Sequence, residues 1–371
     1  MSTPLNHLPL TARSHSRPRV LILTAAVGEG HSAAAGALAL QLQAHNVDTI
    51  IIDGLAAMGE RTRRIVSDGY RSQLRKFPHS YALYYWLLRH FRPVRALTRF
   101  LLTRAGGNTL QEEITRHNPD IIVSTYPVIT VVLSFLRRRG LRIPVVATIT
   151  DMAGLFFWAQ PGIDRHLVMY SHSLAEVEHI AGRGSAQLVA PLIAPEFLCE
   201  RTREAARAAQ NLPQSAHIIL VSGGGWGVGD LAGTVEHLLQ IPESLILCLS
   251  GRNKNEAERL RERFANQTRV RVLGFTKQMP DLLTAADVIV HSTGGVTCLE
   301  AFSRGCPVVV YGLSLGHAKL NGLAMAKHDL VAAATNGHQL IECVQRSQRH
   351  EIVENTTEEA AAAVLSVRPR F

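Results

Sequence analysis

The stretch Val20-Leu21-Ile22-Leu23-Thr24-Ala25-Ala26-Val27-Gly28-Glu29-Gly30-His31 decides how the first half of the chain is expected to fold. Residues 20–24 form a short apolar run that predicts a strand, and a helical segment over residues 32–44 follows the two glycines. A second apolar, β-branched run covers residues 47–53. Continuous apolar strands that alternate with helices are typical of a parallel sheet with helices on both faces.

The same alternation continues along the chain and starts again near residue 217. Further strands are expected at residues 121–124 and 145–150, and then at 217–221, 245–250, 270–273, 287–291 and 307–311. Helices are expected from about residue 230 and over residues 255–265, 279–285 and 296–304. The sequence therefore predicts an α/β protein of two Rossmann-like domains, each with a doubly wound parallel sheet.

Shifts in composition suggest the domain boundaries. The expected parts are a disordered tail over residues 1–18, an N-terminal domain over 19–192, a linker over 193–214, a C-terminal domain over 215–355 and a last segment over 356–371. The linker is rich in Arg, Ala and Pro. The last segment is rich in Ala and Glu, and we expect it to form a helix that packs back on the first domain.

The composition is that of a folded protein with two cores. Of the 371 residues 46% are hydrophobic, and 39 Lys and Arg against 30 Asp and Glu give a net charge of +9. These values exclude disordered, collagen-like and disulfide-stapled proteins. No apolar stretch approaches the roughly 18 residues that span a bilayer, and no apolar signal segment opens the chain. Five scattered cysteines without a Cys-x-x-Cys pair favour a reducing cytoplasm and argue against a zinc site.

Most of the excess of positive over negative charge lies in residues 61–104, which hold 11 basic residues against one acidic residue, with aromatic residues between them. Arg92, Arg95 and Arg99 follow at spacings of three and four, so they share one helical face. A basic amphipathic helix is attracted to an anionic membrane surface. The residues expected to face a membrane are Arg89, Arg92, Arg95 and Arg99. A solvated basic face is the alternative, whereas no recognition motif favours nucleic acid.

The first glycine turn, residues 28–33, permits more than one function. It fits the pattern G-x-G-x-x-A, and Asp53 ends the next strand about 20 residues later, where dinucleotide enzymes place a ribose-binding acid. An NAD(P)-dependent oxidoreductase is therefore one alternative. His31 offers another function, because an exposed histidine beside a helix N-terminus has a lowered pKa and stays neutral near pH 7. A neutral imidazole can remove a proton from a hydroxyl, although a capping or packing role would also explain this histidine.

Two further glycine-rich turns follow strands in the second half. Gly223, Gly224 and Gly225 come after the strand at 217–221, and their backbone N–H groups are expected to face an anion. Gly294 and Gly295 follow the strand at 287–291 and lead into a helix. That helix carries Thr297 and Glu300 on one face, and a carboxylate there suits the two hydroxyls of a ribose. The alternative is a capping box in which Thr297 is the N-cap and Glu300 its partner.

These motifs resemble the monogalactosyldiacylglycerol synthase and processive diacylglycerol glucosyltransferase family. The matching positions are Thr24 to His31, Thr150-Asp151 with Trp158 and Asp164, Gly274-Phe275 with Met279, and Gly294-Gly295-Val296-Thr297 with Glu300-Ala301. The lipid-linked GlcNAc transferase of peptidoglycan synthesis is a more distant relative. The resemblance covers about residues 19–345. It implies a GT-B fold, in which an acceptor domain and a nucleotide-sugar domain face each other across a cleft.

The resemblance also implies roles for individual residues. His31 would be the catalytic base, Asp151 would assist the base or the acceptor, and Gly28 and Gly30 would form the acceptor loop. The residues expected to bind the nucleotide sugar are Gly224, Gly225, Trp226, Phe275, Met279, Gly295, Val296, Thr297, Glu300, His317 and Asn321. Among these, Phe275 and Met279 would flank the base, and Glu300 would hold the ribose.

The implied activity is an inverting transfer of a hexose from a UDP-sugar to the hydroxyl of a diacylglycerol-like lipid. No cofactor and no metal are expected, because the chain lacks a D-x-D sequence and helix and loop amides can stabilise the leaving diphosphate. The expected partners are a UDP-sugar, a lipid acceptor and an anionic membrane surface, with no nucleic acid and no obligate protein partner. The expected location is the cytoplasm, at the inner face of the membrane.

One stretch departs from the family pattern. Members generally carry Gly-Gln-Glu and a later Asn after the last core strand, whereas this chain reads Gly316-His317-Ala318-Lys319-Leu320-Asn321. The carboxamide and carboxylate that contact the donor sugar are thus replaced, and the sequence does not predict which sugar is bound. A sugar-nucleotide epimerase and an inactive nucleotide or lipid sensor of the same fold stay open as alternatives.

Overall fold

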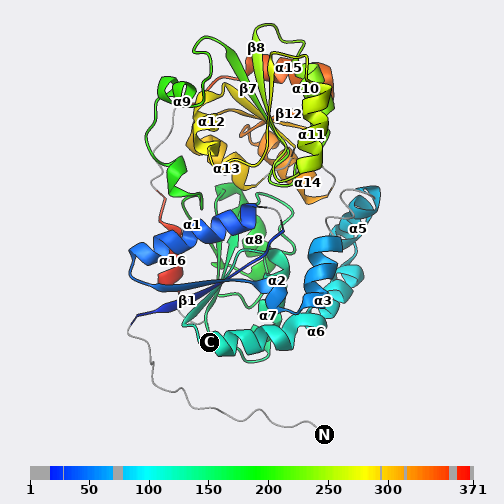
Figure 1. Cartoon of the computed structure of the whole chain (residues 1–371). Coiled ribbons are helices and arrows are strands. Elements are labelled where there is room, and N and C mark those ends of the chain that lie inside the picture. The colour runs from blue at the N-terminus through cyan, green and yellow to red at the C-terminus, as the bar shows by residue number, and fades with distance from the viewer. Residues whose placement is uncertain are drawn as a thin grey trace.

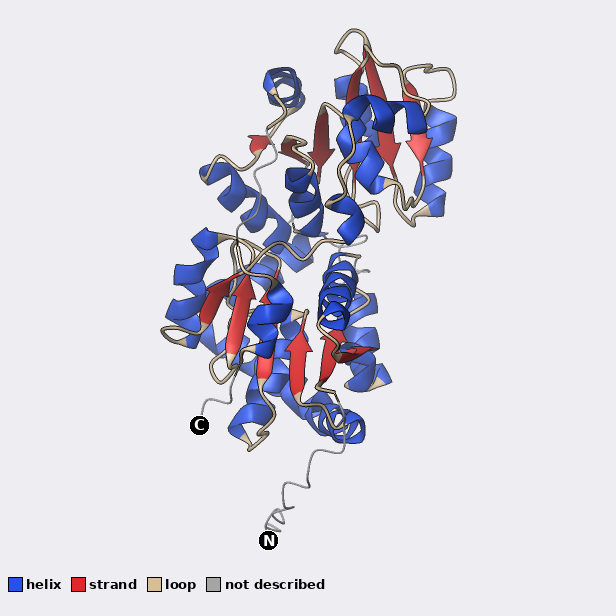
Figure 2. Cartoon of the chain, turned by 90° about the vertical axis from the view of Figure 1, so that its left-hand side faces the viewer, coloured by secondary structure: helices blue, strands red, loops and turns tan. Residues whose placement is uncertain are grey.

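The computed structural model describes residues 17–27, 29–69, 78–292, 295–312, 316–350 and 357–367. Most of the expected tail, residues 1–16, lies outside the described residues, as do Gly28 and Gly294 of the two glycine turns. Two α/β domains lie one above the other, with the N-terminal domain at the bottom of Figure 1. In the turned view of Figure 2 the strands of each domain form one layer with helices on both sides.

The first domain contains a six-stranded sheet in the order β2-β1-β3-β4-β5-β6, and all its strand pairs are parallel. Its strands are β1 (Arg19–Thr24), β2 (Asp48–Asp53), β3 (Ile121–Ser124), β4 (Val145–Ile149), β5 (Arg165–Val168) and β6 (Ala186–Leu188). Its helices are α1 (Gly30–Ala44), α2 (Gly54–Ala57), α3 (Glu60–Arg63), η1 (Arg64–Asp68), α5 (Pro78–His90), α6 (Arg92–His117), α7 (Pro127–Arg138), η2 (Ser171–Ser173) and α8 (Leu174–Ala181).

The second domain contains a parallel sheet in the order β12-β11-β10-β7-β8-β9. Its strands are β7 (His217–Ser222), β8 (Ser244–Leu249), β9 (Val270–Leu273), β10 (Val288–His291), β11 (Val308–Tyr311) and β12 (Ala332–Ala334). Its helices are α10 (Leu231–Leu238), α11 (Lys254–Arg263), α12 (Met279–Ala285), α13 (Val296–Ser303), α14 (His317–Lys327) and α15 (Gly337–Arg346). The predicted pair of doubly wound parallel sheets is therefore confirmed.

Apolar strands buried on both faces explain these sheets. Residues 20–23 of β1 and 218–221 of β7 are almost completely buried, and each strand lies inside its sheet between two strands that come later in the chain. In such sheets ligands bind beyond the carboxyl ends of the strands, at the point where the order reverses. The turns after β1, β7 and β10 lie at these points, so the topology brings the predicted glycine turns to the ends that face the other domain.

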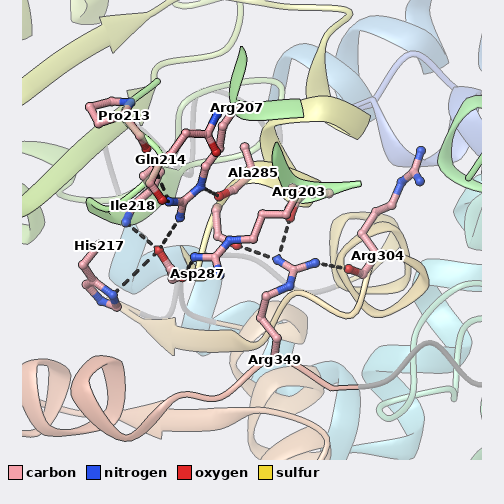
Figure 3. Close-up of polar contacts among 12 residues, drawn as sticks. Arg203, Arg207, Pro213, Gln214, His217, Ile218, Ala285, Asp287, Arg304 and Arg349 are labelled. Atoms are coloured by element: carbon pink, nitrogen blue, oxygen red, sulfur yellow. Dashed lines mark hydrogen bonds and ion pairs between the residues drawn. The ribbon is translucent and has the colours of Figure 1, made fainter. Parts of the chain in front are cut away.

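The expected linker, residues 193–214, is not a free connection. It contains η3 (Pro195–Phe197) and α9 (Arg203–Ala209), and α9 packs against α12 of the second domain. Arg203 and Arg207 both donate to the carboxylate of Asp287, which also accepts the Ile218 N–H at 2.7 Å (Figure 3). The Arg- and Ala-rich composition thus reflects a helix that forms buried ion pairs, which composition alone did not reveal.

The chain leaves the second domain beside this cluster. Arg349, three residues after α15, donates to the backbone carbonyl groups of Leu283, Ala286 and Arg304 (Figure 3). The segment before β7 and the segment after α15 both connect the two domains. Both are therefore fixed near the amino-terminal ends of strands β10 and β11 of the second sheet.

The last described helix, α16 (Ala360–Leu365), lies against α1 of the first domain (Figure 1). The Ala361 N–H donates to the Gln41 side chain at 3.3 Å, and His45 contacts Glu359 at 2.9 Å. Ala360, Ala361, Ala363 and Val364 are fully buried.

Candidate active site

His31 lies in the first turn of α1, not on the preceding loop, and its ring is partly buried between aromatic side chains. The ring centroids of Tyr126 and Trp158 lie 5.0 and 5.6 Å from that of His31. Burial lowers the pKa of His31 to about 4; Asp151 opposes this shift and His317 adds to it. Burial, rather than the helix dipole that we expected, therefore keeps this imidazole neutral. Its Nδ1 atom has no hydrogen-bond partner among the described residues.

Asp151 follows β4 and lies where the two domains approach each other. The Trp158 Nε1–H donates to one carboxylate oxygen of Asp151 at 2.9 Å. The other oxygen would lie 3.7 Å from a Cβ atom built on Gly295 of the second domain. Since Asp151 also acts on the pKa of His31, the predicted base and the predicted assisting carboxylate belong to one group of side chains.

The first turns of α1 and α13 face each other across the domain boundary (Figure 1). A Cβ atom on Gly30 would lie 3.4 Å from the Val296 side chain. Gly295 is the N-cap of α13 and has a φ of +95°, which a residue with a side chain rarely adopts. The positive ends of two helix dipoles thus meet in this cleft, which favours an anionic ligand.

Glu300 points from α13 into a mostly buried position, and burial raises its pKa to about 8. Burial raises the pKa of Cys298 to about 12, and Glu300 and Asp151 add to this shift, so these two carboxyl groups lie near the same buried thiol. The capping-box alternative is wrong, because Gly295 and not Thr297 is the N-cap. Glu300 is therefore not required to cap its own helix.

We expected the backbone N–H groups of the glycine turn after β7 to face an anion, but several N–H groups of this turn form hydrogen bonds within it. The Gly224 N–H donates to Ser222 Oγ, and the N–H groups of Gly227 and Val228 donate to carbonyl groups within the turn. Trp226, expected to contact the nucleotide sugar, packs against the apolar cluster of the first domain that contains Val27 and Tyr126. This turn therefore also holds the domains together.

Of the two residues expected to flank the base, Phe275 is 46% exposed and Met279 packs against the core at the start of α12. The guanidinium group of Arg252 lies 3.7 Å from the centroid of the Phe275 ring. Arg252 in turn pairs with Glu29, the residue before Gly30. Neither Arg252 nor Glu29 was identified from the sequence, since a pair separated by more than 200 positions leaves no local pattern.

Residues 316–321, which differ from the family pattern, lie at the start of α14 and contact the first domain. The His317 Nδ1 atom lies 3.0 Å from the Tyr81 hydroxyl of α5, and the side-chain carbonyl of Asn321 accepts the Met152 N–H at 2.6 Å. The Tyr85 hydroxyl is buried without a hydrogen-bond partner in the described part of the chain, and burial raises the pKa of Tyr85. Tyr81 and Tyr85 are among the aromatic residues that lie between the basic residues of 61–104, and their spacing of four is the signal that they share one face of a helix.

A cavity of about 420 Å³ lies between α5, α6, α8 and α14. Its lining includes Arg89, Arg95, Phe156, Glu176, Leu320 and Ala324. It is therefore formed by both domains, with charged residues from the first domain and apolar residues from the second.

Two of the four arginines expected to face a membrane point toward their own domain. Arg99 donates to the Phe156 carbonyl at 2.7 Å, and the Arg95 guanidinium lies 5.7 Å from the Phe156 ring. Arg89 and Arg92 are exposed. The exposed face of α6 is apolar instead, with Leu97, Phe100 and Leu101 between 55% and 58% exposed. The arginine face packs on the loop after β4, and this orientation turns the apolar residues outward.

Within the described residues, no helix has both the length and the apolar character to cross a bilayer. The same residues contain no group of three or more His, Cys, Asp or Glu side chains placed to hold a metal ion. Asp53, the acid required by the dinucleotide alternative, accepts the N–H groups of Leu55 and Ala56 as the N-cap of α2.

Comparison with known proteins relates both domains to glycosyltransferases. Residues 31–181 match the family model of monogalactosyldiacylglycerol (MGDG) synthase, and residues 218–350 match that of glycosyl transferases group 1. The processive diacylglycerol beta-glucosyltransferase of Bacillus pumilus is 26% identical over 316 residues, which are 83% of this chain and 80% of that protein. The enzyme of the same name from Bacillus subtilis is 25% identical over 337 residues, 89% of this chain and 87% of its own.

Solved structures share the fold. WaaG, a glycosyltransferase involved in lipopolysaccharide biosynthesis, superposes with a TM-score of 0.50 at 14% identity, covering 89% of this chain and 90% of its own. Os79 from O. sativa gives a TM-score of 0.54 at 15% identity, covering 88% of this chain and 90% of its own. The expected GT-B fold is thus confirmed. The chain therefore has the GT-B fold, its first half matches the monogalactosyldiacylglycerol synthase model, and its second half matches that of glycosyl transferases group 1.

Proposed function

We propose that this protein transfers a hexose from a UDP-sugar to the hydroxyl of a diacylglycerol-like lipid, with inversion at the anomeric carbon. The observation that carries the proposal is the meeting of His31, Asp151 and the first turn of α13 at the domain boundary. The names of the relatives supply the lipid class, since both Bacillus proteins are called diacylglycerol glucosyltransferases.

In the proposed reaction His31 acts as the general base. A ring nitrogen of His31 takes the proton of the acceptor hydroxyl; the Nδ1 atom is buried and has no protein partner among the described residues. As His31 removes the proton, the acceptor oxygen bonds to the anomeric carbon and the bond from that carbon to the diphosphate oxygen breaks. Asp151, oriented by Trp158, stabilises the imidazolium that forms. A single displacement of this kind inverts the anomeric configuration.

The second domain holds the donor in this proposal. Glu300 accepts hydrogen bonds from the ribose hydroxyls, and the positive end of α13 stabilises the leaving diphosphate without proton transfer. The site residues proposed for the donor stay those expected from the sequence, with Trp226 and Asn321 now also serving the domain contact.

The acceptor reaches this site from the side of α5 and α6. The cavity of about 420 Å³ has apolar walls at Phe156 and Leu320 that suit acyl chains. The exposed apolar residues of α6 enter the outer part of an anionic leaflet. We place the protein in the cytoplasm, bound to the inner face of the membrane.

Incubation with a panel of UDP-sugars and diacylglycerol-containing vesicles, followed by mass spectrometry of the lipids, tests the proposal. The expected product is a diacylglycerol heavier by one or more hexoses, formed with only one or a few of the donors. Absence of sugar transfer to any lipid, with UDP still bound, would favour the inactive sensor that the replacement by His317 and Ala318 suggested.

A further inference from the structure

A side chain of the first domain covers the glycine turn of the second domain where the donor diphosphate is expected. Glu29 precedes Gly30, and its Cγ atom lies 2.2 Å from the place that a Cβ atom on Gly225 would occupy. The lack of a side chain at Gly225 therefore leaves room for Glu29. Its carboxylate lies beside the turn that follows β7, at the carboxyl end of the central strand.

Arg252 holds this carboxylate. Its Nε–H donates to one Glu29 oxygen at 2.6 Å, and a second nitrogen lies 3.5 Å from the other oxygen. The Arg252 backbone N–H donates to the Gly225 carbonyl at 2.8 Å, and its guanidinium stacks on Phe275. These contacts hold the Arg252 guanidinium beside the glycine turn, and the carboxylate of Glu29 in the opposite domain pairs with its charge.

The ion pair between Arg252 and Glu29 is exposed to solvent, and breaking it costs little free energy. The side chains of Arg252 and Glu29 are 54% and 39% exposed, and exposed pairs of this kind contribute little to stability. A guanidinium binds phosphate oxygens through two parallel hydrogen bonds, which are among the stronger hydrogen bonds in proteins. A diphosphate and the Glu29 carboxylate repel each other, so both cannot lie beside Arg252.

We propose that Arg252 binds the diphosphate of the donor and that Glu29 occupies this cation until the donor displaces it; this rests on the function proposed above. Because Glu29 is two residues before His31 in the same turn, the exchange couples donor binding to the position of the base. Glu29 is thus a positioning residue that competes with the donor, and Arg252 is a binding residue for phosphate.

Calorimetric titrations with UDP and with uridine test the proposal. Arg252→Ala is expected to weaken UDP binding at least tenfold and to leave uridine binding unchanged, since uridine carries no phosphate. Arg252→Lys should give an intermediate loss, because lysine keeps the charge but not the paired geometry. Glu29→Gln is expected to strengthen UDP binding about threefold to fivefold, the range that loss of an exposed competing pair allows.

The controls are two exposed ion pairs outside the cleft. Glu60→Gln removes the acid that pairs with Arg63 in the first domain, and Arg263→Ala removes the base that pairs with Glu236 in the second. Neither variant should alter UDP or uridine binding. Thermal melts of every variant establish that the fold is kept.

The proposal predicts that Arg252→Ala weakens UDP binding and that Glu29→Gln strengthens it, and these opposite changes decide the outcome. If Glu29→Gln weakens UDP binding as Arg252→Ala does, the pair is a permanent clasp between the domains and the proposal is wrong. It is equally wrong if Arg252→Ala binds UDP like the wild type. If the wild type binds neither UDP nor uridine, the proposed function itself fails, which separates the two conclusions.

Discussion

The imidazole of His31 stays neutral because of what surrounds it. Tyr126 and Trp158 exclude water from the ring, and burial lowers its pKa to about 4. A base with this pKa is unprotonated throughout the physiological range. In the proposed mechanism it gains strength because Asp151 stabilises the protonated form that the reaction produces.

Replacement of His31 by alanine should therefore abolish most of the transfer without affecting the donor site. We expect turnover to fall at least ~100-fold, which is the usual contribution of a general base, with the Kd for UDP unchanged. Radiolabelled transfer and calorimetry measure the two quantities. His338→Ala, on a side chain that is 83% exposed, is the control; turnover near wild type in His31→Ala would remove His31 from the mechanism.

Glu300 makes donor binding depend on pH. Burial raises its pKa to about 8, so the carboxyl group is protonated at neutral pH and must ionise to accept two ribose hydrogen bonds. The affinity for uridine should rise about tenfold per pH unit between pH 6 and 7 and level off above pH 8. Uridine is the right ligand here because it has no phosphate that titrates in this range.

Glu300→Gln should bind uridine with an affinity that does not change over this pH range. A wild-type affinity that is constant from pH 6 to 9 would mean that Glu300 binds the ribose in its neutral form or does not bind it. His31, with a pKa of about 4, does not titrate in this window.

At the scale of elements, α6 divides its functions between two faces. One face carries Arg95 and Arg99 onto the loop after β4, and the other exposes Leu97, Phe100 and Leu101. The basic periodicity of the sequence correctly predicted a shared face, but the pattern does not state whether that face points outward. The loop that covers it, around Phe156, lies more than 50 positions away.

The triple variant Leu97→Ser, Phe100→Ser and Leu101→Ser should release the protein from anionic vesicles. Each side chain contributes on the order of 1 kcal/mol when it leaves water, so the partition coefficient should fall more than tenfold. Vesicle sedimentation at 0.15 M salt measures it. Leu40→Ser, on an apolar side chain of α1 that is 50% exposed, should have no effect; equal retention of the triple variant would contradict the role of α6.

The strands and glycine turns were predictable because their signals are local. Apolar runs as continuous as those of β1 and β7 are buried wherever they occur in a parallel sheet, and the turns follow them directly. The packing of the expected linker at 193–214 was not predictable, because Arg203 and Arg207 are ordinary surface residues until Asp287 is placed beside them. Contacts across the domain boundary, such as those of Tyr81 and Arg252, likewise depend on the packed molecule.

At the scale of the whole molecule, Asp287 joins the segment of residues 193–214 to the second domain through Arg203 and Arg207. Its side chain is 18% exposed, and that of its partner Arg207 is 2% exposed. Asp287→Ala would leave Arg207 charged and buried without its carboxylate, which typically costs about 3 kcal/mol or more. We expect a loss of this size in the free energy of unfolding by urea.

Glu236→Ala, which removes an exposed pair with Arg263, should change the stability by less than about 1 kcal/mol. A loss in Asp287→Ala as small as in this control would mean that the cluster adds little to the domain junction. Donor affinity should be unaffected in a fully folded sample of either variant, since Asp287 precedes β10 at the strand end away from the cleft and Glu236 lies near the end of α10.

The contact of α16 with α1 constrains the order in which the protein matures. The ribosome completes the helix that bears His31 early, yet residues 360–365, which pack against this helix, follow the whole second domain in the chain. The helix that bears His31 therefore gains this contact only after the second domain has been synthesised.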